Sequence, residues 1–140
     1  MSPLELVAEL HRRQGEMYAG GPVDPVAELL AEDIVWHVPG GSPIAGDHRG
    51  TAAVVEYFES RRRLADATMQ MRPGEAIVDG DAVAQFVTGT ATLGGESVSW
   101  QTIGVYRLDA EHRRILEVWL VTLDADLFDR IWSSGDLGPL

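Results

Sequence analysis

The sequence of 140 residues contains no cysteine and few basic side chains. Without cysteine, the chain can form no disulfide, no thiolate nucleophile and no cysteine-ligated zinc or iron–sulfur centre. Eleven basic residues stand against 22 acidic ones, which gives a formal charge of −11 at pH 7. Nucleic acids and anionic membranes both select a basic surface, so we expect neither as a partner. The only basic run, Arg61-Arg62-Arg63, is typical of the solvated end of a helix.

Long apolar runs are also missing, and no stretch approaches the length that spans a membrane. Met1-Ser2-Pro3 leads directly into an amphipathic pattern, so we expect no signal peptide. The absence of cysteine fits a reducing compartment, and we therefore expect a cytoplasmic protein. Hydrophobic residues make up 45% of the chain, an ordinary share for a globular protein. The length predicts a single domain over residues 1–140.

The hydrophobic periodicity predicts helices in the first half of the chain and strands in the second. Helical spacing is found near residues 3–17, 24–30 and 51–65. Strands are expected at 34–38, 69–78, 82–93, 97–108 and 115–123, and residues 124–132 are interpreted as a short helix or an irregular tail. This order predicts an α+β fold with a mostly antiparallel sheet. Because the later strands are apolar on both faces, we expect helices on one face and a second subunit on the outer one, as a homodimer.

Residues 33–50 are the first place to look for chemistry. The strand at 34–38 ends abruptly at Pro39-Gly40-Gly41, and Gly50-Thr51 opens a helix. Alternation puts Val35 and His37 on one face, and Trp36 and Val38 on the other. We therefore expect an imidazole in mid-strand, between two apolar layers.

Three stretches carry a resemblance to a known family. They are LLAEDIVWHVPG (29–40), TAAVVEYF (51–58) and YRLD-x-x-x-R-x-ILEVW (106–119), the last followed by Leu123-Asp124. With them the chain resembles the SnoaL-like members of the nuclear-transport-factor-2-like superfamily, which include ketosteroid isomerases, limonene-epoxide hydrolases and polyketide cyclases. The resemblance implies a cone-shaped fold, in which a curved sheet wraps around N-terminal helices and leaves a deep apolar pocket. It implies many possible chemistries, because this fold serves several enzymes.

The catalytic residues of these relatives carry over only in part. The carboxylate base of the isomerases falls at Val38, or at His37 with one gap. Their oxyanion pair falls at Gln14 (or Arg13) and Gly104.

The other two mechanisms are incomplete as well. An asparagine of the epoxide hydrolases matches His37, while their water-activating aspartate falls at Val121. The cyclases resemble this chain at Asp124, near the end of the last strand.

Each candidate has a functional and a structural interpretation. His37 is either a general base or water-positioning group, or a core histidine with a hydrogen-bonded partner. Asp124 is either an acid or base in the site, or the N-cap of the terminal segment. His48 lies in the loop and could line the mouth of the pocket, whereas His11 and His112 are interpreted as surface residues. We expect no metal, because the histidines lack the companion ligands of a zinc site.

The expected pocket is lined by aromatic and apolar side chains, which suits a flat ring system. Trp100 and Thr102 are expected on the same strand face as Gly104, and Trp119 on the same strand face as Val121. Gln14 could donate a hydrogen bond to a developing oxyanion. The predicted pocket residues are Gln14, Met17, Val35, His48, Tyr57, Phe58, Trp100, Thr102, Trp119 and Val121.

These observations favour a cofactor-independent enzyme that acts on a small to medium apolar, cyclic organic molecule. The reaction would be an isomerisation, cyclisation, dehydration or epoxide opening, with His37 as base or water-positioning group. The alternative is a non-catalytic ligand-binding or dimerisation module that keeps the cone without the catalytic carboxylates.

Overall fold

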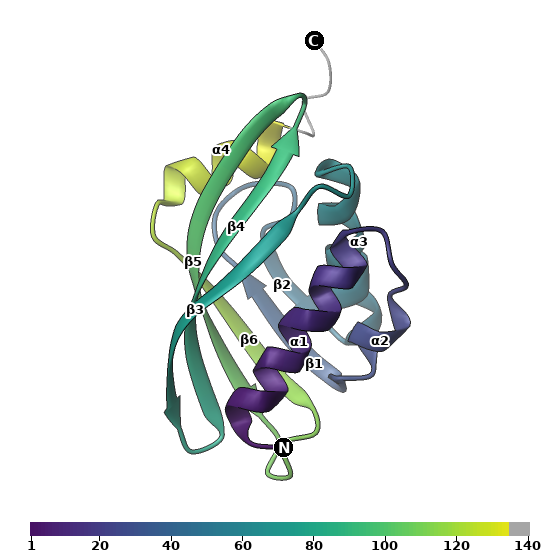
Figure 1. Cartoon of the computed structure of the whole chain (residues 1–140), viewed down its shortest axis with the longest axis vertical. Coiled ribbons are helices and arrows are strands. Elements are labelled where there is room, and N and C mark those ends of the chain that lie inside the picture. Colours follow the sequence, from purple (N-terminus) through teal and green to yellow (C-terminus); the bar gives the residue numbers. More distant parts are fainter. Residues whose placement is uncertain (135–140) are drawn as a thin grey trace.

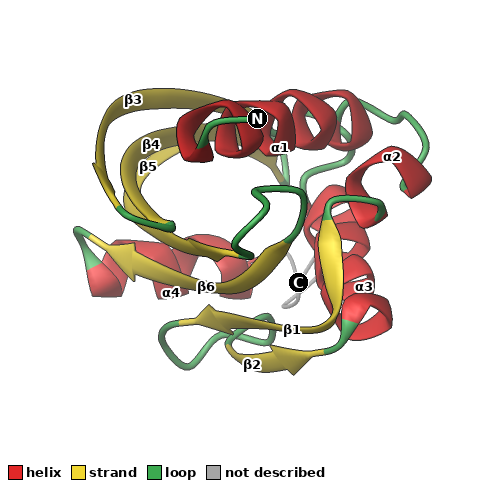
Figure 2. Ribbon diagram, turned by 90° about the horizontal axis from the view of Figure 1, so that it is seen from below, coloured by secondary structure: helices red, strands yellow, loops and turns green. Residues whose placement is uncertain are grey.

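The structure, a computed structural model, is described here for residues 1–134 (Figures 1 and 2). It confirms the α+β fold and the curved, mostly antiparallel sheet. The helices are α1 (Pro3–Tyr18), α2 (Asp24–Ala27), α3 (Thr51–Leu64) and α4 (Ala125–Ser134), and the strands are β1 (Leu30–Val38), β2 (Gly46–Arg49), β3 (Gln70–Asp79), β4 (Ala82–Leu93), β5 (Glu96–Leu108) and β6 (Ile115–Thr122).

The six strands form one sheet in the order β2-β1-β6-β5-β4-β3. Strand β1 runs parallel to β6, and every other neighbouring pair is antiparallel. The short strand β2 was not expected from the sequence, which predicted a loop there. It forms because residues 46–49 fold back as a hairpin partner of β1, with Val38 opposite Gly46.

Local signals explain where the helices begin. Ser2 caps α1: its hydroxyl accepts a hydrogen bond from the Glu5 backbone, and the Glu5 carboxylate accepts one from the Ser2 backbone. Pro3 occupies the first turn, where its missing N–H costs nothing. Helices α1, α2 and α3 lie on the concave side of the sheet (Figure 2), and α4 lies at the end of the molecule away from the N-terminus (Figure 1). Among residues 1–134, each helix is too short or too polar to span a membrane.

The sheet has an inner face, toward α1 and α3, and an outer face. On the inner face one row of cross-strand neighbours joins Trp36, Val118, Tyr106 and Val83, all of them buried. Trp36 packs edge-on against Phe58 of α3, with ring centroids 4.9 Å apart. The core therefore lies between the inner face and the helices, and side chains on the outer face do not belong to it.

Candidate functional site

His37 lies on the outer face of the sheet, in a row with Trp119, Val105 and Ala84. The predicted alternation in β1 is confirmed, since Trp36 is buried on the other side of the strand. The predicted setting between two apolar layers is wrong. The His37 side chain is 25% exposed, and each of its ring nitrogens faces a carboxylate.

The imidazole of His37 joins three strands through charged partners. Its Nδ1 lies 2.7 Å from Asp47 Oδ1 on β2, and its Nε2 lies 2.7 Å from Glu117 Oε2 on β6. Arg107 on β5 donates to the other oxygen of Glu117 at 2.8 Å. We call these four residues the outer network. The two carboxylates lie at opposite nitrogens of one ring, so a single metal ion could not reach all three groups.

The electrostatics of the outer network favour a charged imidazole. Burial lowers the pKa of His37, but its hydrogen bonds to Glu117 and Asp47 outweigh this effect and raise the net pKa above the ordinary 6.5. The pKa of Glu117 is lowered by the hydrogen bond from Arg107 and then by that from His37. The hydrogen bond from His37 also lowers the pKa of Asp47. A protonated His37 with two satisfied nitrogens has no free lone pair with which to accept a proton.

The structure separates the predicted pocket residues into two groups. Trp119 and Val121 lie on the outer face and are 36% and 47% exposed. The Trp119 ring stacks on His37 with centroids 5.5 Å apart. The prediction that Trp119 and Val121 share an interior with Trp100 is therefore wrong, because both side chains point to the outer face of β6. Val35 lies on the same outer face, opposite Glu117.

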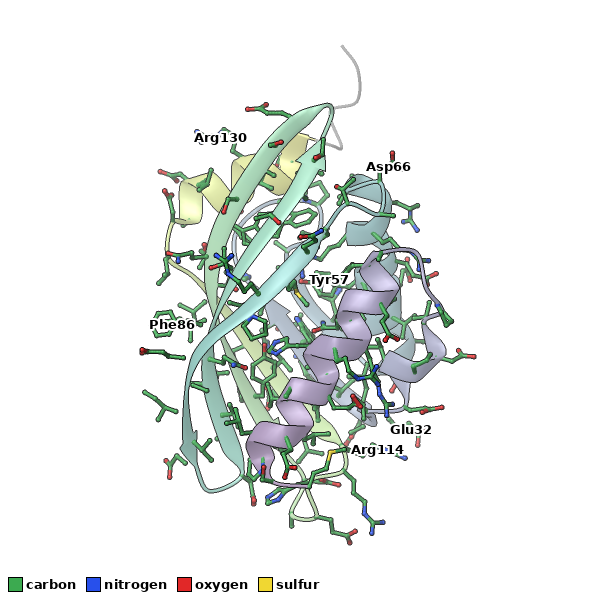
Figure 3. All side chains as sticks on the ribbon, in the orientation of Figure 1. Glu32, Tyr57, Asp66, Phe86, Arg114 and Arg130 are labelled. Atoms are coloured by element: carbon green, nitrogen blue, oxygen red, sulfur yellow. The ribbon has the colours of Figure 1, made fainter. Side chains whose placement is uncertain are left out.

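Most of the other predicted pocket residues lie on the inner side of the sheet. The ring of His48 stacks on Tyr57 with centroids 4.7 Å apart, and its Nε2 donates to the Ile44 carbonyl at 2.8 Å. Figure 3 shows Tyr57 lying between the helices and the sheet, whereas Phe86 points away from the sheet. The buried members of this group are Gln14, Met17, Tyr57, Phe58, Trp100 and Thr102.

A second histidine, His11, lies in this interior, although it was expected at the surface. It is 7% exposed, and its Nε2 lies 3.0 Å from the hydroxyl oxygen of Tyr106 on β5. The other nitrogen, Nδ1, is buried without a hydrogen-bond partner. The sequence did contain the signal: His11 falls on the same helical stripe as Val7, Gln14 and Tyr18, each of which is buried.

Burial decides the protonation of this pair. It lowers the pKa of His11 from 6.5 to about 4, so the imidazole is neutral at pH 7. It also raises the pKa of the Tyr106 hydroxyl, which therefore stays protonated. When the hydroxyl donates to Nε2 of the neutral ring, Nδ1 carries the proton and becomes a free donor inside the protein.

Gly104 makes room for this pair. A side-chain Cβ at position 104 would lie 2.3 Å from the Tyr106 hydroxyl oxygen, which is closer than any real contact. The resemblance assigned an acid of the isomerases to this position. Here the hydroxyl of Tyr106 takes its place, and His11 lies one helical turn before Gln14, the position that the resemblance assigned to the partner tyrosine.

Arg61 is the second buried group that the sequence interpretation placed in solvent. Its side chain comes from α3 and is 4% exposed, whereas Arg63 in the same run is exposed. The guanidinium Nη1 donates to the Tyr57 hydroxyl at 2.9 Å and approaches that of Tyr18 at 3.5 Å. The ring of Trp132 lies over it, with 4.7 Å from Cζ to the ring centroid.

Asp124 caps α4, as its structural interpretation predicted. Its Oδ1 accepts a hydrogen bond from the Leu127 backbone at 3.0 Å. The residue also borders an open groove of about 400 Å³ between β5, β6 and α4. The groove is lined by Ser99, Trp100, Gln101, Thr122, Leu123, Asp124 and Leu127.

Comparison with known proteins gives a family and a set of related folds. The sequence matches the SnoaL-like domain family over residues 11–118. A search of curated proteins found no match. The fold is similar to that of a Xanthomonas campestris protein of unknown function with a cystatin-like fold, at 21% identity and a TM-score of 0.83, covering 95% of this chain and 99% of that one.

Two further structures are similar at slightly higher identity. Bal32a, from a soil-derived mobile gene cassette, is 26% identical with a TM-score of 0.80, covering 94% of this chain and 99% of that one. SalBIII is described as an epoxide hydrolase/cyclase-like enzyme in pyran ring formation in the polyether salinomycin. It is 25% identical with a TM-score of 0.70, covering 86% of this chain and 89% of that one.

Proposed function

Because this chain belongs to the SnoaL-like domain family, we propose that it is a cofactor-independent enzyme that acts on a small to medium cyclic organic molecule. In this proposal the substrate lies against the inner face of the sheet, and the chemistry belongs to His11 and Tyr106 rather than to His37. The reaction is of the isomerase, cyclase or epoxide-opening type, in which negative charge develops on a substrate oxygen.

The observation that carries the proposal is the buried hydrogen bond between His11 and Tyr106, with one imidazole nitrogen left free. A histidine with a pKa of about 4 is a weak base, but it stays neutral throughout the working range. A neutral imidazole can polarise a carbonyl or epoxide oxygen by donating its N–H, and it needs no charged partner to do so. The Tyr106 hydroxyl fixes the tautomer that makes this donor available.

The surroundings of the pair support an apolar ring as substrate. The inner side carries the aromatic rings of Trp36, Tyr57, Phe58 and Trp100, which are all buried. Aromatic walls exclude water and hold flat rings, so a hydrogen bond inside them acts at low dielectric. The description of SalBIII as an epoxide hydrolase/cyclase-like enzyme points to the same class of reaction.

The test begins with a thermal-shift screen against cyclic ketones, polyketide-like aromatics, terpenoids and epoxides, followed by mass spectrometry of each stabilising compound for turnover. A ligand at a hundred times its dissociation constant adds about 2.7 kcal/mol to folding stability. Removing a donor to an oxyanion costs on the order of 100-fold to 1,000-fold in kcat. We expect His11→Leu to lose turnover by about that factor, and Tyr106→Phe to lose it in the same direction.

Two further variants make the test specific. His112→Gln removes a histidine on the exposed turn before β6, and we expect it to keep full activity. His37→Gln separates the two candidate histidines, because the sequence alone favoured His37. If His37→Gln loses turnover while His11→Leu stays fully active, the catalytic role belongs to His37 on the outer face. If the folded protein is neither stabilised by any compound class nor turns any compound over, the non-catalytic module is favoured.

We also propose that the outer face binds a second copy of the chain. Helices α1, α2 and α3 lie on the concave side of the sheet (Figure 2), and large apolar side chains remain exposed on the other face, which is unusual for a monomer. A two-fold dimer would bury the same patch on both copies. Light scattering should give a dimer for the natural chain and a monomer for Val121→Glu, with Ala52→Glu on α3 as the control. The patch consists of Ile77, Phe86, Trp119, Val121 and Leu123.

A further inference from the structure

Arg61 is a buried cation without an anion. A guanidinium is charged at every accessible pH, and charges are rarely buried unless they are paired. Within residues 1–134, no carboxylate forms an ion pair with Arg61. The polar partners of Arg61 are the neutral hydroxyls of Tyr57 and Tyr18, and its Nε is buried without a hydrogen-bond partner.

The contrast with other arginines makes this arrangement more informative. Arg12, Arg62 and Arg107 are all more exposed than Arg61, yet each lies within 4 Å of a carboxylate. The chain carries 22 acidic side chains, so anions are plentiful. The most desolvated of these four cations is the one that lacks a carboxylate. Such a site is electrostatically complementary to an anion that arrives from outside.

We propose that Arg61 binds an anionic oxygen group, a carboxylate or an ionised enol or phenol, on a ring-bearing substrate. This inference rests on the proposed function, and it adds a charge to the substrate class: the ring would be an organic acid rather than a neutral molecule. The planar guanidinium suits two oxygens at once, and its free Nε supplies one of the donors.

The hydroxyl groups around Arg61 would complete the site. Burial raises the pKa of both Tyr18 and Tyr57, so the two phenols stay protonated beside the cation. The Tyr57 oxygen accepts from Arg61, which leaves its own proton available to an incoming oxygen. A cation and protonated hydroxyls together form a donor set for an oxyanion.

Aromatic rings around the guanidinium select for a flat ligand. Cζ of Arg61 lies 5.6, 5.4 and 4.7 Å from the ring centroids of Tyr18, Tyr57 and Trp132. Trp132 packs edge-on against Trp100 with centroids 5.2 Å apart, and Trp100 also lines the groove beside α4. A continuous set of aromatic contacts therefore links the groove with Arg61.

The experiment compares acids with their neutral amides. The probe pairs are 2-naphthoic acid with 2-naphthamide, and 1-hydroxy-2-naphthoic acid with its amide. Calorimetry at pH 7.5 in 150 mM NaCl gives each dissociation constant. We expect at least one acid to bind the natural chain tenfold or more tightly than its amide. Arg61→Met should abolish this preference, while Arg63→Gln, an exposed position on the same helix with the same loss of charge, should keep it.

A milder variant covers the case in which Arg61→Met does not fold. Tyr57→Phe removes one hydroxyl and keeps the ring, so it should weaken the acid severalfold and leave the amide unchanged. The inference would be overturned if the natural chain bound acid and amide equally tightly. It would also be overturned if no compound of any pair bound. An equal loss of preference in Arg63→Gln would also overturn it. None of these results depends on turnover, so they are distinct from failure of the His11 test.

Discussion

The two faces of the sheet hold histidines in opposite states. On the outer face, His37 has a carboxylate at each nitrogen and a raised pKa. On the inner side, His11 has one phenol, one free nitrogen and a pKa of about 4. The same side chain therefore has a carboxylate partner at both ring nitrogens in one place and one ring nitrogen without a partner in the other. The partners of the two ring nitrogens therefore say more about the role of a histidine than its place in a sequence motif does.

The largest expected effect comes from comparing two tryptophans on opposite faces. Trp36 is 2% exposed and packs on Phe58, whereas Trp119 is 36% exposed. Trp36→Ala should lower the free energy of unfolding by about 3–5 kcal/mol, because it empties part of the core. Trp119→Ala should cost less than about 1 kcal/mol in the Val121→Glu background, which is monomeric under the proposed dimer. Urea denaturation measures both, and equal losses would contradict the assignment of the faces.

The next effect is acid destabilisation by His11. Its pKa is about 4 in the folded chain and 6.5 when unfolded, so the unfolded chain binds the extra proton between these values. Stability should fall by about 3 kcal/mol as the pH drops from 7 to below 4, at 1.36 kcal/mol per pKa unit. His11→Leu should remove this component. If the difference in unfolding free energy between the natural chain and His11→Leu does not change with pH, this would argue against a buried neutral imidazole.

A smaller effect should follow from filling the space above Gly104. The added methyl group of Gly104→Ala would collide with the Tyr106 hydroxyl, at 2.3 Å. We expect a loss of about 1–3 kcal/mol, as for other overpacked cores, together with a weaker contact between Tyr106 and His11. Ala84→Ser on the outer face is the control and should change stability by less than about 0.5 kcal/mol. Thermal unfolding of the two variants decides the point.

The smallest effect belongs to the outer network. Because the folded pKa of His37 is raised, its contribution is complete below pH 6.5 and is lost as the pH rises through the folded value. The lowered pKa values of Asp47 and Glu117 keep both carboxylates charged until the solution is distinctly acidic. We expect His37→Gln to cost less than about 1 kcal/mol at pH 6, since these groups are partly exposed. The cost should shrink as the pH rises through the folded pKa of His37, and a cost that grows with pH would reverse the assignment.

The sequence predicted the elements better than the site. The alternation of β1 separated His37 from Trp36 correctly, and Asp124 caps α4 as one of its two interpretations proposed. Two of the errors came from side chains whose type suggests solvent. His11 and Arg61 lie on apolar helical stripes and are buried, but a basic residue on such a stripe could also reach the surface. Only the packing of α1 and α3 on the sheet settles which happens.

The sequence by itself determined the order of helices α1, α2 and α3 and of every strand except β2, the cap that begins α1, and the division of each strand into two faces. These features depend on neighbours a few residues apart along the chain. The tertiary structure decided which face of β6 became the inner one, and so placed Val118 in the core and Trp119 outside. It also brought His11 to Tyr106 across 95 residues. Both faces of β6 are apolar in sequence, so only the side on which the helices pack distinguishes them.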